Sequence, residues 1–268
     1  MDRISKALEL AKQGRPAQQS SARLEQSPKQ IVYTQTKTVH VSPETLRANR
    51  IISGFQNEPW VDIYRVLRTR VIRRLRRNNW KTLGVTSAKP GEGKTLTAVN
   101  LAVSIAMEPN YSVLLVDADL RRPSVHSLFA IETDRGLSDF LVSDIPIEEL
   151  FIHPSIDRVT ILPCVSPSKT SSELLVTPKM IGLIQELKTR YPSRIVIFNL
   201  PPVLVGDDVV ALAPLLDAIL LVVEDGKTRS DELARVAELL EDAKLLGTVL
   251  NKSPQVDYRD TDYYRSVP

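Results

Sequence analysis

From Thr82 onward, short apolar runs alternate with longer amphipathic segments, and this alternation constrains the fold more than any other feature of the chain. The runs are continuously apolar, which is typical of strands buried on both faces of a parallel sheet. We therefore predict an α/β fold in which helices flank a mostly parallel β-sheet and ligands bind at the carboxyl ends of the strands. The predicted strands are 82–87, 112–117, 158–163, 194–199, 218–224 and 245–250, and the predicted helices are 94–107, 122–129, 178–190, 207–215 and 230–243.

The first 58 residues differ in character and are predicted to form a helical and flexible N-terminal extension. Residues 1–13 have apolar residues at helical spacing and predict a short amphipathic helix. Residues 13–30 are rich in Gln, Ser and Pro, which is typical of a flexible linker, and residues 31–58 show no clear period. A basic helix is predicted at 61–77, because apolar residues recur there at helical spacing opposite a charged face.

Charge divides the chain into a basic N-terminal part and an acidic remainder. Residues 1–80 hold 16 Lys and Arg against 6 Asp and Glu, a net charge of +10, whereas residues 81–268 carry −7. This asymmetry favours an anionic contact for the basic part: a neighbouring subunit, an acidic partner or an anionic membrane surface. The single cysteine, Cys164, allows no internal disulfide, and no apolar run is long enough to span a bilayer, so we expect a cytoplasmic protein.

A glycine-rich stretch, SAKPGEGKT at 87–95, lies between the first predicted strand of the sheet and a helix. Gly91 and Gly93 allow the backbone to curl so that its N–H groups point at phosphate oxygens. Lys94 would reach the β- and γ-phosphates, and the Thr95 hydroxyl would bind Mg²⁺. An incidental turn with a lysine is the alternative, which the strand-to-helix context disfavours. The residues predicted to bind the nucleotide at this loop are Lys89, Pro90, Gly91, Glu92, Gly93, Lys94, Thr95 and Leu96.

Two aspartates follow the next strand, in VLLVDADLRRP at 113–123. Asp117 and Asp119 are two residues apart, so at a strand end they would point to the same side. Beside a triphosphate, one carboxylate can deprotonate a hydroxyl nucleophile and the other can hold Mg²⁺ through water. A pair of solvated loop acids is the alternative. Arg121 and Arg122 would touch phosphate or a neighbouring subunit, or lie on a solvated face.

These motifs together resemble the bacterial tyrosine kinases of capsule and exopolysaccharide synthesis, whose kinase domain is related to Min/Par-type ATPases. The resemblance rests on the phosphate loop, on DADLRRP and on a strand ending in xxPP, and it covers about 60–252. Asp62, Arg65 and Arg68 have the spacing of the family's E-x-x-R-x-x-R oligomerisation motif, with Asp for Glu. GLSDFL at 136–141 and LLGTVLNK at 245–252 also look like family segments. The predicted N-terminal helix resembles the N-terminal segment of kinases that are encoded in gene clusters for exosortase-linked exopolysaccharide.

The resemblance implies a protein-tyrosine autokinase that uses ATP and Mg²⁺. Lys94, Asp117 and Asp119 would be the catalytic residues, with Asp117 as the base and Asp119 as a metal ligand. The copies would form a homo-oligomeric ring in which the tail of one subunit enters the next subunit's active site. The tail tyrosines that would be phosphorylated are Tyr258, Tyr263 and Tyr264.

The resemblance also implies a domain layout and partners. The kinase domain would span 59–252, between the extension at 1–58 and a tyrosine-containing tail at 253–268. Expected partners are a membrane-embedded regulator of polysaccharide chain length, which would hold the kinase peripherally at the inner face of the plasma membrane, and a tyrosine phosphatase. No nucleic-acid partner is expected.

Asn199 departs from the family pattern, which has aspartate at the end of this strand. Thr95, Asp119 and Asn199 would then hold the metal. Exchanging a charge-assisted bond for a neutral one costs on the order of 1–2 kcal/mol, or roughly 10- to 30-fold in rate or metal affinity. A catalytically weakened nucleotide-binding scaffold is therefore an alternative function. Asp208 matches a family acid after PP, but a capping role with Asp207 at the following helix is favoured.

Two further positions leave alternatives open. Lys89 resembles the early lysine of the deviant phosphate loop in Min/Par-type ATPases, which reaches a neighbour's phosphates, but an exposed loop lysine is favoured. A Min/Par-type ATPase is accordingly a third candidate function. Asn251 follows the last strand and would either read the adenine edge or cap a turn. The histidines have no metal-binding spacing, and neither they nor Cys164 is assigned chemistry; they are His40, His126 and His153.

Overall fold

The computed structural model describes residues 36–55 and 58–254. The predicted N-terminal helix, its linker and the three tail tyrosines lie outside the described residues. None of the described helices combines the length and the apolar character needed to cross a membrane.

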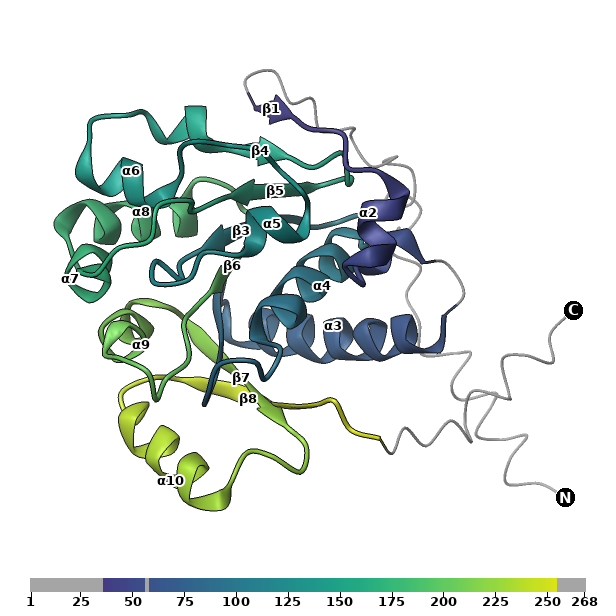
Figure 1. Ribbon diagram of the computed structural model, residues 1–268, viewed down its shortest axis with the longest axis vertical. Helices are drawn as coiled ribbons and strands as arrows, with labels where there is room; N and C mark the ends of the chain where they lie inside the picture. The colour runs from purple at the N-terminus through teal and green to yellow at the C-terminus, as the bar shows by residue number, and fades with distance from the viewer. Residues whose placement is uncertain (1–35, 56–57, 255–268) are drawn as a thin grey trace, which may run out of the picture. The chain divides into compact units, whose positions relative to one another are not determined.

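An eight-stranded sheet forms the centre of the described fold (Figure 1). Its strand order is β1-β4-β5-β3-β6-β2-β7-β8, and every neighbouring pair is parallel except β4 with β5. All six predicted strands are present, which confirms the mostly parallel α/β prediction. The strands are β1 (Lys37–Thr38), β2 (Thr82–Ser87), β3 (Ser112–Asp117), β4 (Ile152–His153), β5 (Val159–Leu162), β6 (Arg194–Asn199), β7 (Ala218–Glu224) and β8 (Leu245–Asn251).

Helices cover both faces of the sheet, because its central strands are apolar on both faces. Along β3, Val113 and Leu115 belong to one buried cluster, whereas Leu114 and Val116 belong to the other. Helices α3 and α4 pack in the first cluster, and α8, α9 and α10 contribute to the second. The helices are α2 (Pro43–Ala48), α3 (Pro59–Asn78), α4 (Lys94–Ala106), α5 (Val125–Leu128), α6 (Leu137–Val142), α7 (Ser171–Leu175), α8 (Pro178–Thr189), α9 (Asp208–Leu212) and α10 (Ser230–Leu239).

Part of the predicted extension belongs to the folded unit. Residues 36–55 form β1, α2 and a short 3₁₀ turn, and Ile51 and Ile52 are fully buried in the first cluster. Asn100 of α4 accepts a hydrogen bond from the Ile52 N–H and donates one to the Arg50 carbonyl, both at 2.9 Å. The sequence pattern missed this segment because its elements are too short to show a period.

The predicted helix at 122–129 is shorter in the structure. Only Val125–Leu128 is helical, and the N–H groups of Ser124 and Val125 donate to the Asp117 carboxylate at 2.8 and 2.9 Å. These bonds tie the preceding loop to the end of β3. The loop that carries Asp119 is therefore anchored at both of its ends.

Candidate functional site

The glycine-rich loop joins β2 to α4 in a conformation that requires its glycines. Gly91 and Gly93 have φ of +85° and +95°, which side chains with a Cβ rarely adopt. A Cβ at position 93 would also lie well inside contact distance of Asn251 Nδ2. The loop thus exposes backbone N–H groups at the N-terminus of a 13-residue helix, a favourable arrangement for phosphate.

Side chains from elsewhere in the fold hold this loop in place. Glu92 is almost fully buried, and its carboxylate accepts hydrogen bonds from the Lys89 N–H at 3.0 Å and from the Thr228 hydroxyl at 2.7 Å. Asn251 Nδ2 donates to the Glu92 carbonyl at 2.8 Å, and Lys252 Nζ donates to the Gly91 carbonyl at 2.7 Å. Asn251 therefore clamps the loop, a role that the sequence did not indicate.

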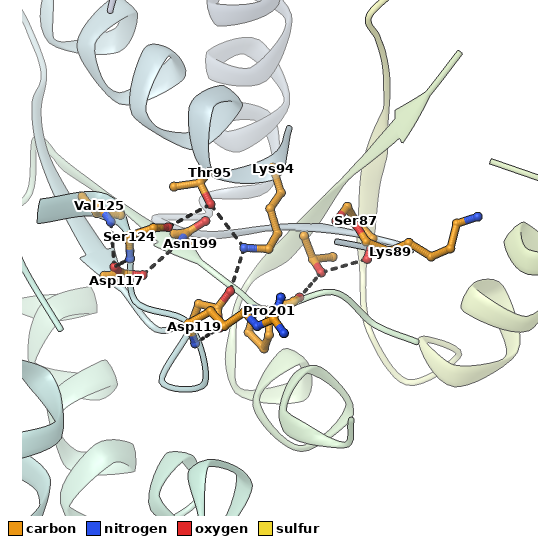
Figure 2. A network of polar contacts seen from close by, with 12 residues as sticks. Ser87, Lys89, Lys94, Thr95, Asp117, Asp119, Ser124, Val125, Asn199 and Pro201 are labelled. Atoms are coloured by element: carbon orange, nitrogen blue, oxygen red, sulfur yellow. Dashed lines mark hydrogen bonds and ion pairs between the residues drawn. The ribbon is translucent and has the colours of Figure 1, made fainter. Parts of the chain in front are cut away.

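Lys94 and the two carboxylates lie together at the carboxyl end of the sheet (Figure 2). Lys94 Nζ is 2.8 Å from Asp119 Oδ2 and donates to the Thr95 hydroxyl at 3.2 Å. The other oxygen of Asp119 accepts the Arg122 N–H at 3.0 Å. The structure thus brings the predicted phosphate-loop lysine, the half-buried Thr95 and the second aspartate into one cluster.

Asp117 is fully buried, and three N–H groups hold its carboxylate. Ser124 and Val125 donate to Oδ2, and Asn199 Nδ2 donates to Oδ1 at 2.8 Å. Burial raises the pKa of the Asp117 carboxyl, whereas the three hydrogen bonds act to lower this pKa. A carboxyl with a raised pKa beside a phosphate loop has the properties of a general base.

Asn199 lies directly opposite Asp117 in the parallel pairing of β3 and β6. Its amide satisfies one Asp117 oxygen, whereas an aspartate here would place two carboxylates against each other with no hydrogen to share. The Asn199 Oδ1 atom is buried and has no hydrogen-bond partner within the described part of the chain. A buried acceptor without a partner costs about 1–3 kcal/mol, so this oxygen is suited to a metal ion or a metal-bound water.

Mg²⁺ fits the residues present. It prefers oxygen ligands and retains several waters, and the Thr95 hydroxyl, the Asp119 carboxylate and the unpartnered Asn199 oxygen supply that chemistry. The fit of Mg²⁺ therefore rests on the buried Asn199 Oδ1 atom, which has no hydrogen-bond partner in the described residues. Elsewhere in the described residues, no group of three or more His, Cys, Asp or Glu side chains is arranged to hold a metal.

Lys89 lies at the start of the loop but is turned away from Lys94 (Figure 2). Its ammonium group pairs with Glu232 in the first turn of α10 at 2.8 Å. In this conformation the lysine fastens the phosphate loop to α10.

The predicted capping role of Asp207 and Asp208 is wrong. Asp207 occupies the N-cap position of α9 without a capping hydrogen bond. Asp208 is buried and instead pairs with Arg121 Nε at 2.6 Å, and Asp207 approaches the same guanidinium at 3.4 Å. The acids thus fasten Arg121, from the loop after Asp119, to the segment after β6. Sequence could not reveal this pair because its partners lie 87 residues apart.

A cavity of about 650 Å³ opens beside the loop, and sequence reasoning did not predict it. Asn251 and Leu96 line it together with three aromatic residues from before and within α3, namely Phe55, Trp60 and Tyr64. Phe55 and Trp60 meet edge to face with ring centroids 4.8 Å apart. Flat apolar walls next to a phosphate loop are suited to a planar base.

The three residues of the predicted oligomerisation motif have different environments on α3. Asp62 and Arg65 are exposed and pair with each other at 2.6 Å. Arg68 instead packs onto α4, where it pairs with Glu108 at 2.9 Å and donates to the Ser104 carbonyl. Of these three residues, only Asp62 and Arg65 are therefore available on the described surface for contact with another copy.

Comparison with known proteins agrees with this geometry. A family model described as an AAA domain matches residues 80–253. The tyrosine-protein kinase YwqD of Bacillus subtilis is 34% identical over 203 residues, which are 75% of this chain and 84% of that protein. The succinoglycan biosynthesis transport protein ExoP of Rhizobium meliloti is 30% identical over 213 residues, 77% of this chain but 27% of that protein.

Solved structures show the same relationship. The chimerical protein CapA2B2 superposes with a TM-score of 0.72 at 27% identity, covering 82% of this chain and 94% of that one. The cell division ATPase MinD of Pyrococcus furiosus shares the fold, with a TM-score of 0.56 at 22% identity over 70% of this chain and 80% of that one. The chain belongs to the family of bacterial tyrosine-protein kinases, which is built on a P-loop ATPase fold.

Proposed function

We propose that this chain is a protein-tyrosine autokinase that transfers the γ-phosphoryl group of ATP to tyrosines in the C-terminal tail of a neighbouring copy. The observation that carries the proposal is the cluster of Lys94, Thr95, Asp117 and Asp119 at the end of a well-fixed phosphate loop. The membership of the chain in a family of tyrosine kinases supports the same reaction. Tyr258, Tyr263 and Tyr264 are the proposed acceptors.

Each group of the cluster has a distinct proposed role. The loop N–H groups and Lys94 bind the phosphates and stabilise charge on the transferred group. Thr95, Asp119 and Asn199 would hold Mg²⁺, which neutralises phosphate charge when bound. Asp117 takes the proton of the tyrosine hydroxyl, for which its raised pKa is suited. The aromatic cavity accommodates the adenine, with Asn251 at its edge.

Asn199 is proposed to leave this chemistry working. Its amide supplies Asp117 with a hydrogen bond, and its free oxygen faces the same cluster, so the position retains both an orienting group and an oxygen ligand. The catalytically weakened scaffold is the competing candidate, and the missing charge of Asn199 favours it. The variant N199D distinguishes the two: a gain of tenfold or more in phosphorylation supports the scaffold, and a change below threefold supports a tolerated substitution.

The proposed partners follow from the relatives. ExoP is named as a succinoglycan biosynthesis transport protein, and a membrane-embedded regulator of polysaccharide chain length is the proposed partner of this chain. That partner would place the kinase at the inner face of the plasma membrane, and a tyrosine phosphatase would reset it. Rings of copies would present each tail to the next active site, with Asp62 and Arg65 at the contact.

A mixing experiment tests both the reaction and its intermolecular direction. The K94A variant keeps the tail but lacks the phosphate-binding lysine, and a Y258F/Y263F/Y264F variant keeps the active site but lacks the acceptors. With Mg-ATP, neither protein alone should give phosphotyrosine in the tail, whereas the mixture should give it on K94A. Absence of phosphotyrosine in the mixture and in the wild type, with a membrane activator present, would contradict the kinase proposal.

A further inference from the structure

A basic groove separates α3 from the edge strand β8, and it shares one lining residue, Leu67, with the aromatic cavity. Its volume is about 530 Å³. One wall consists of the C-terminal half of α3 and the other of Leu246, Gly247 and Thr248 in β8. Four arginines of α3 line it: Arg70, Arg73, Arg74 and Arg77.

The charge of these arginines is not balanced by neighbouring acids. Within residues 36–55 and 58–254, none of the four forms an ion pair, whereas Arg65 and Arg68 on the same helix pair with Asp62 and Glu108. Like charges three or four residues apart on a helix repel one another. The groove therefore concentrates positive charge that an anionic occupant would neutralise.

Backbone geometry also fits the groove to an anion. Arg74 donates to the Leu246 carbonyl, which fixes its guanidinium against β8. A Cβ at position 247 would lie 2.9 Å from Arg74 Nη1, so Gly247 provides the room that this guanidinium occupies. Guanidinium groups bind phosphate oxygens through pairs of parallel N–H bonds, which makes a fixed arginine beside exposed arginines a suitable phosphate anchor.

The chain continues from the groove wall directly into the tail. β8 ends at Asn251, about 10 Å along the strand from Thr248, and Tyr258 follows seven residues later, within an extended reach of about 23–25 Å. Tyr263 and Tyr264 have a longer reach still. The tail segment 254–268 has three aspartates and two arginines, a net charge of −1. Each phosphate on a tyrosine adds about −1.5 to −2.

We propose that this groove, which we call the Arg70–Arg77 groove, binds the phosphorylated C-terminal tail of the same chain. The inference rests on the proposed function, which supplies the phosphotyrosine. Phosphorylation gives the tail enough negative charge to match the four arginines, and the short connection from β8 keeps its local concentration high. A tail held in its own groove is withheld from the neighbour's active site, so the product of the reaction disfavours further phosphorylation of that tail.

Peptide binding tests the groove without relying on kinase activity. The probes are synthetic peptides of residues 254–268 with a fluorescent label, one unmodified and one phosphorylated on all three tyrosines. The receptor is the full chain with Y258F/Y263F/Y264F, so that its own tail carries no phosphate. We expect the phosphopeptide to bind at least tenfold more tightly, and R73E/R77E to remove that preference.

Matched variants distinguish binding in this groove from nonspecific attraction to the positive charge of α3. R76E changes an exposed arginine of α3 that does not line the groove, and it should leave the preference within threefold of the parent. R73K/R77K keeps the charge but loses the paired N–H geometry, and it should give an intermediate loss. Circular dichroism melting of each variant checks that α3 remains folded.

Three outcomes would overturn the proposal. Equal affinity for the two peptides would remove the role of phosphate, and an equal loss in R76E would remove the role of the groove. Binding to vesicles of phosphatidylglycerol that R73E/R77E abolishes and that excess phosphopeptide does not displace would assign the groove to a membrane. Because the peptides are synthetic, failure here beside a positive mixing experiment leaves the kinase proposal intact.

Discussion

The proposed active-site cluster of Lys94, Thr95, Asp117 and Asp119 and the basic face of α3 are both rich in charge, yet they are built on opposite principles. In the cluster, Lys94, Asp119 and Asp117 are buried and almost every polar atom has a partner within the chain. On α3, Arg70, Arg73 and Arg77 are exposed and have no ion-pair partner in the described residues. Buried charge must be satisfied internally because desolvation is costly, whereas exposed charge can remain available for a partner.

This difference indicates where binding energy comes from in each region. The cluster offers a fixed geometry, so its substitutions should act on catalysis and on stability. The arginines offer attraction that is realised only on binding, so their substitutions should act on association and leave stability almost unchanged. Four substitutions in the cluster and in the residues that adjoin it test the first half of that comparison, in descending order of expected effect.

The largest effect is expected from K94A. Removing the ammonium group takes away the donor that we propose for the transferred phosphate, and we expect a loss of about 10²- to 10³-fold in phosphorylation rate. Radiolabelled ATP with purified protein measures it. K89A is the matched control from the same loop, since Lys89 pairs with Glu232 and points away from the cluster, and it should retain activity within threefold. Equal losses in both variants would contradict the assignment.

G93A should destabilise the loop and the fold around it. The φ of +95° and the collision with Asn251 together should cost about 1–3 kcal/mol in unfolding free energy. Urea denaturation measures this cost, and nucleotide affinity should fall with it. Gly182 in α8 is the contrasting position, because a Cβ there meets nothing within 4 Å and G182A should stabilise by about 0.5–1 kcal/mol. A neutral G93A would show that the loop is not held as described.

N199D should make stability depend on Mg²⁺. Two facing carboxylates repel each other and raise the pKa of the pair, so unfolding temperature should fall in EDTA relative to the parent. Added Mg²⁺ should restore it, because the ion separates the charges. Calorimetry with and without EDTA compares the two proteins. A melting temperature of N199D that does not respond to Mg²⁺ would place the metal elsewhere.

A smaller effect is expected in the pH dependence of stability. Burial raises the folded-state pKa of Asp117, so the folded protein retains this proton to a higher pH than the unfolded chain does. Its contribution is fully present below the unfolded value of about 3.9 and is lost as pH rises through the raised pKa. The D117N variant cannot titrate at this position, so the parent should lose stability relative to D117N as the pH rises above the unfolded-state value of about 3.9. Denaturant titrations without Mg²⁺ measure this difference, and parallel curves would contradict it.

Local pattern was enough to predict the sheet and the loop. Continuous apolar runs gave all six long strands of the described sheet, and the spacing of Gly91, Gly93, Lys94 and Thr95 identified the phosphate loop. Both signals are local, because burial on two faces and a tight turn each restrict the residue types at consecutive positions. The same reasoning placed Asp117 and Asp119 at the site, since parallel strands end at one edge.

Contacts between distant residues were decided only by the tertiary structure. The pairing of Asn199 with Asp117, of Asp208 with Arg121 and of Asn251 with the Glu92 carbonyl each joins residues more than 80 positions apart. No periodicity or motif encodes such pairs, because they depend on strand order and register. The sequence by itself therefore determined which chemical groups this protein carries to the end of its sheet. The packed fold determined which of them touch, which remain free, and which arginines face an open groove.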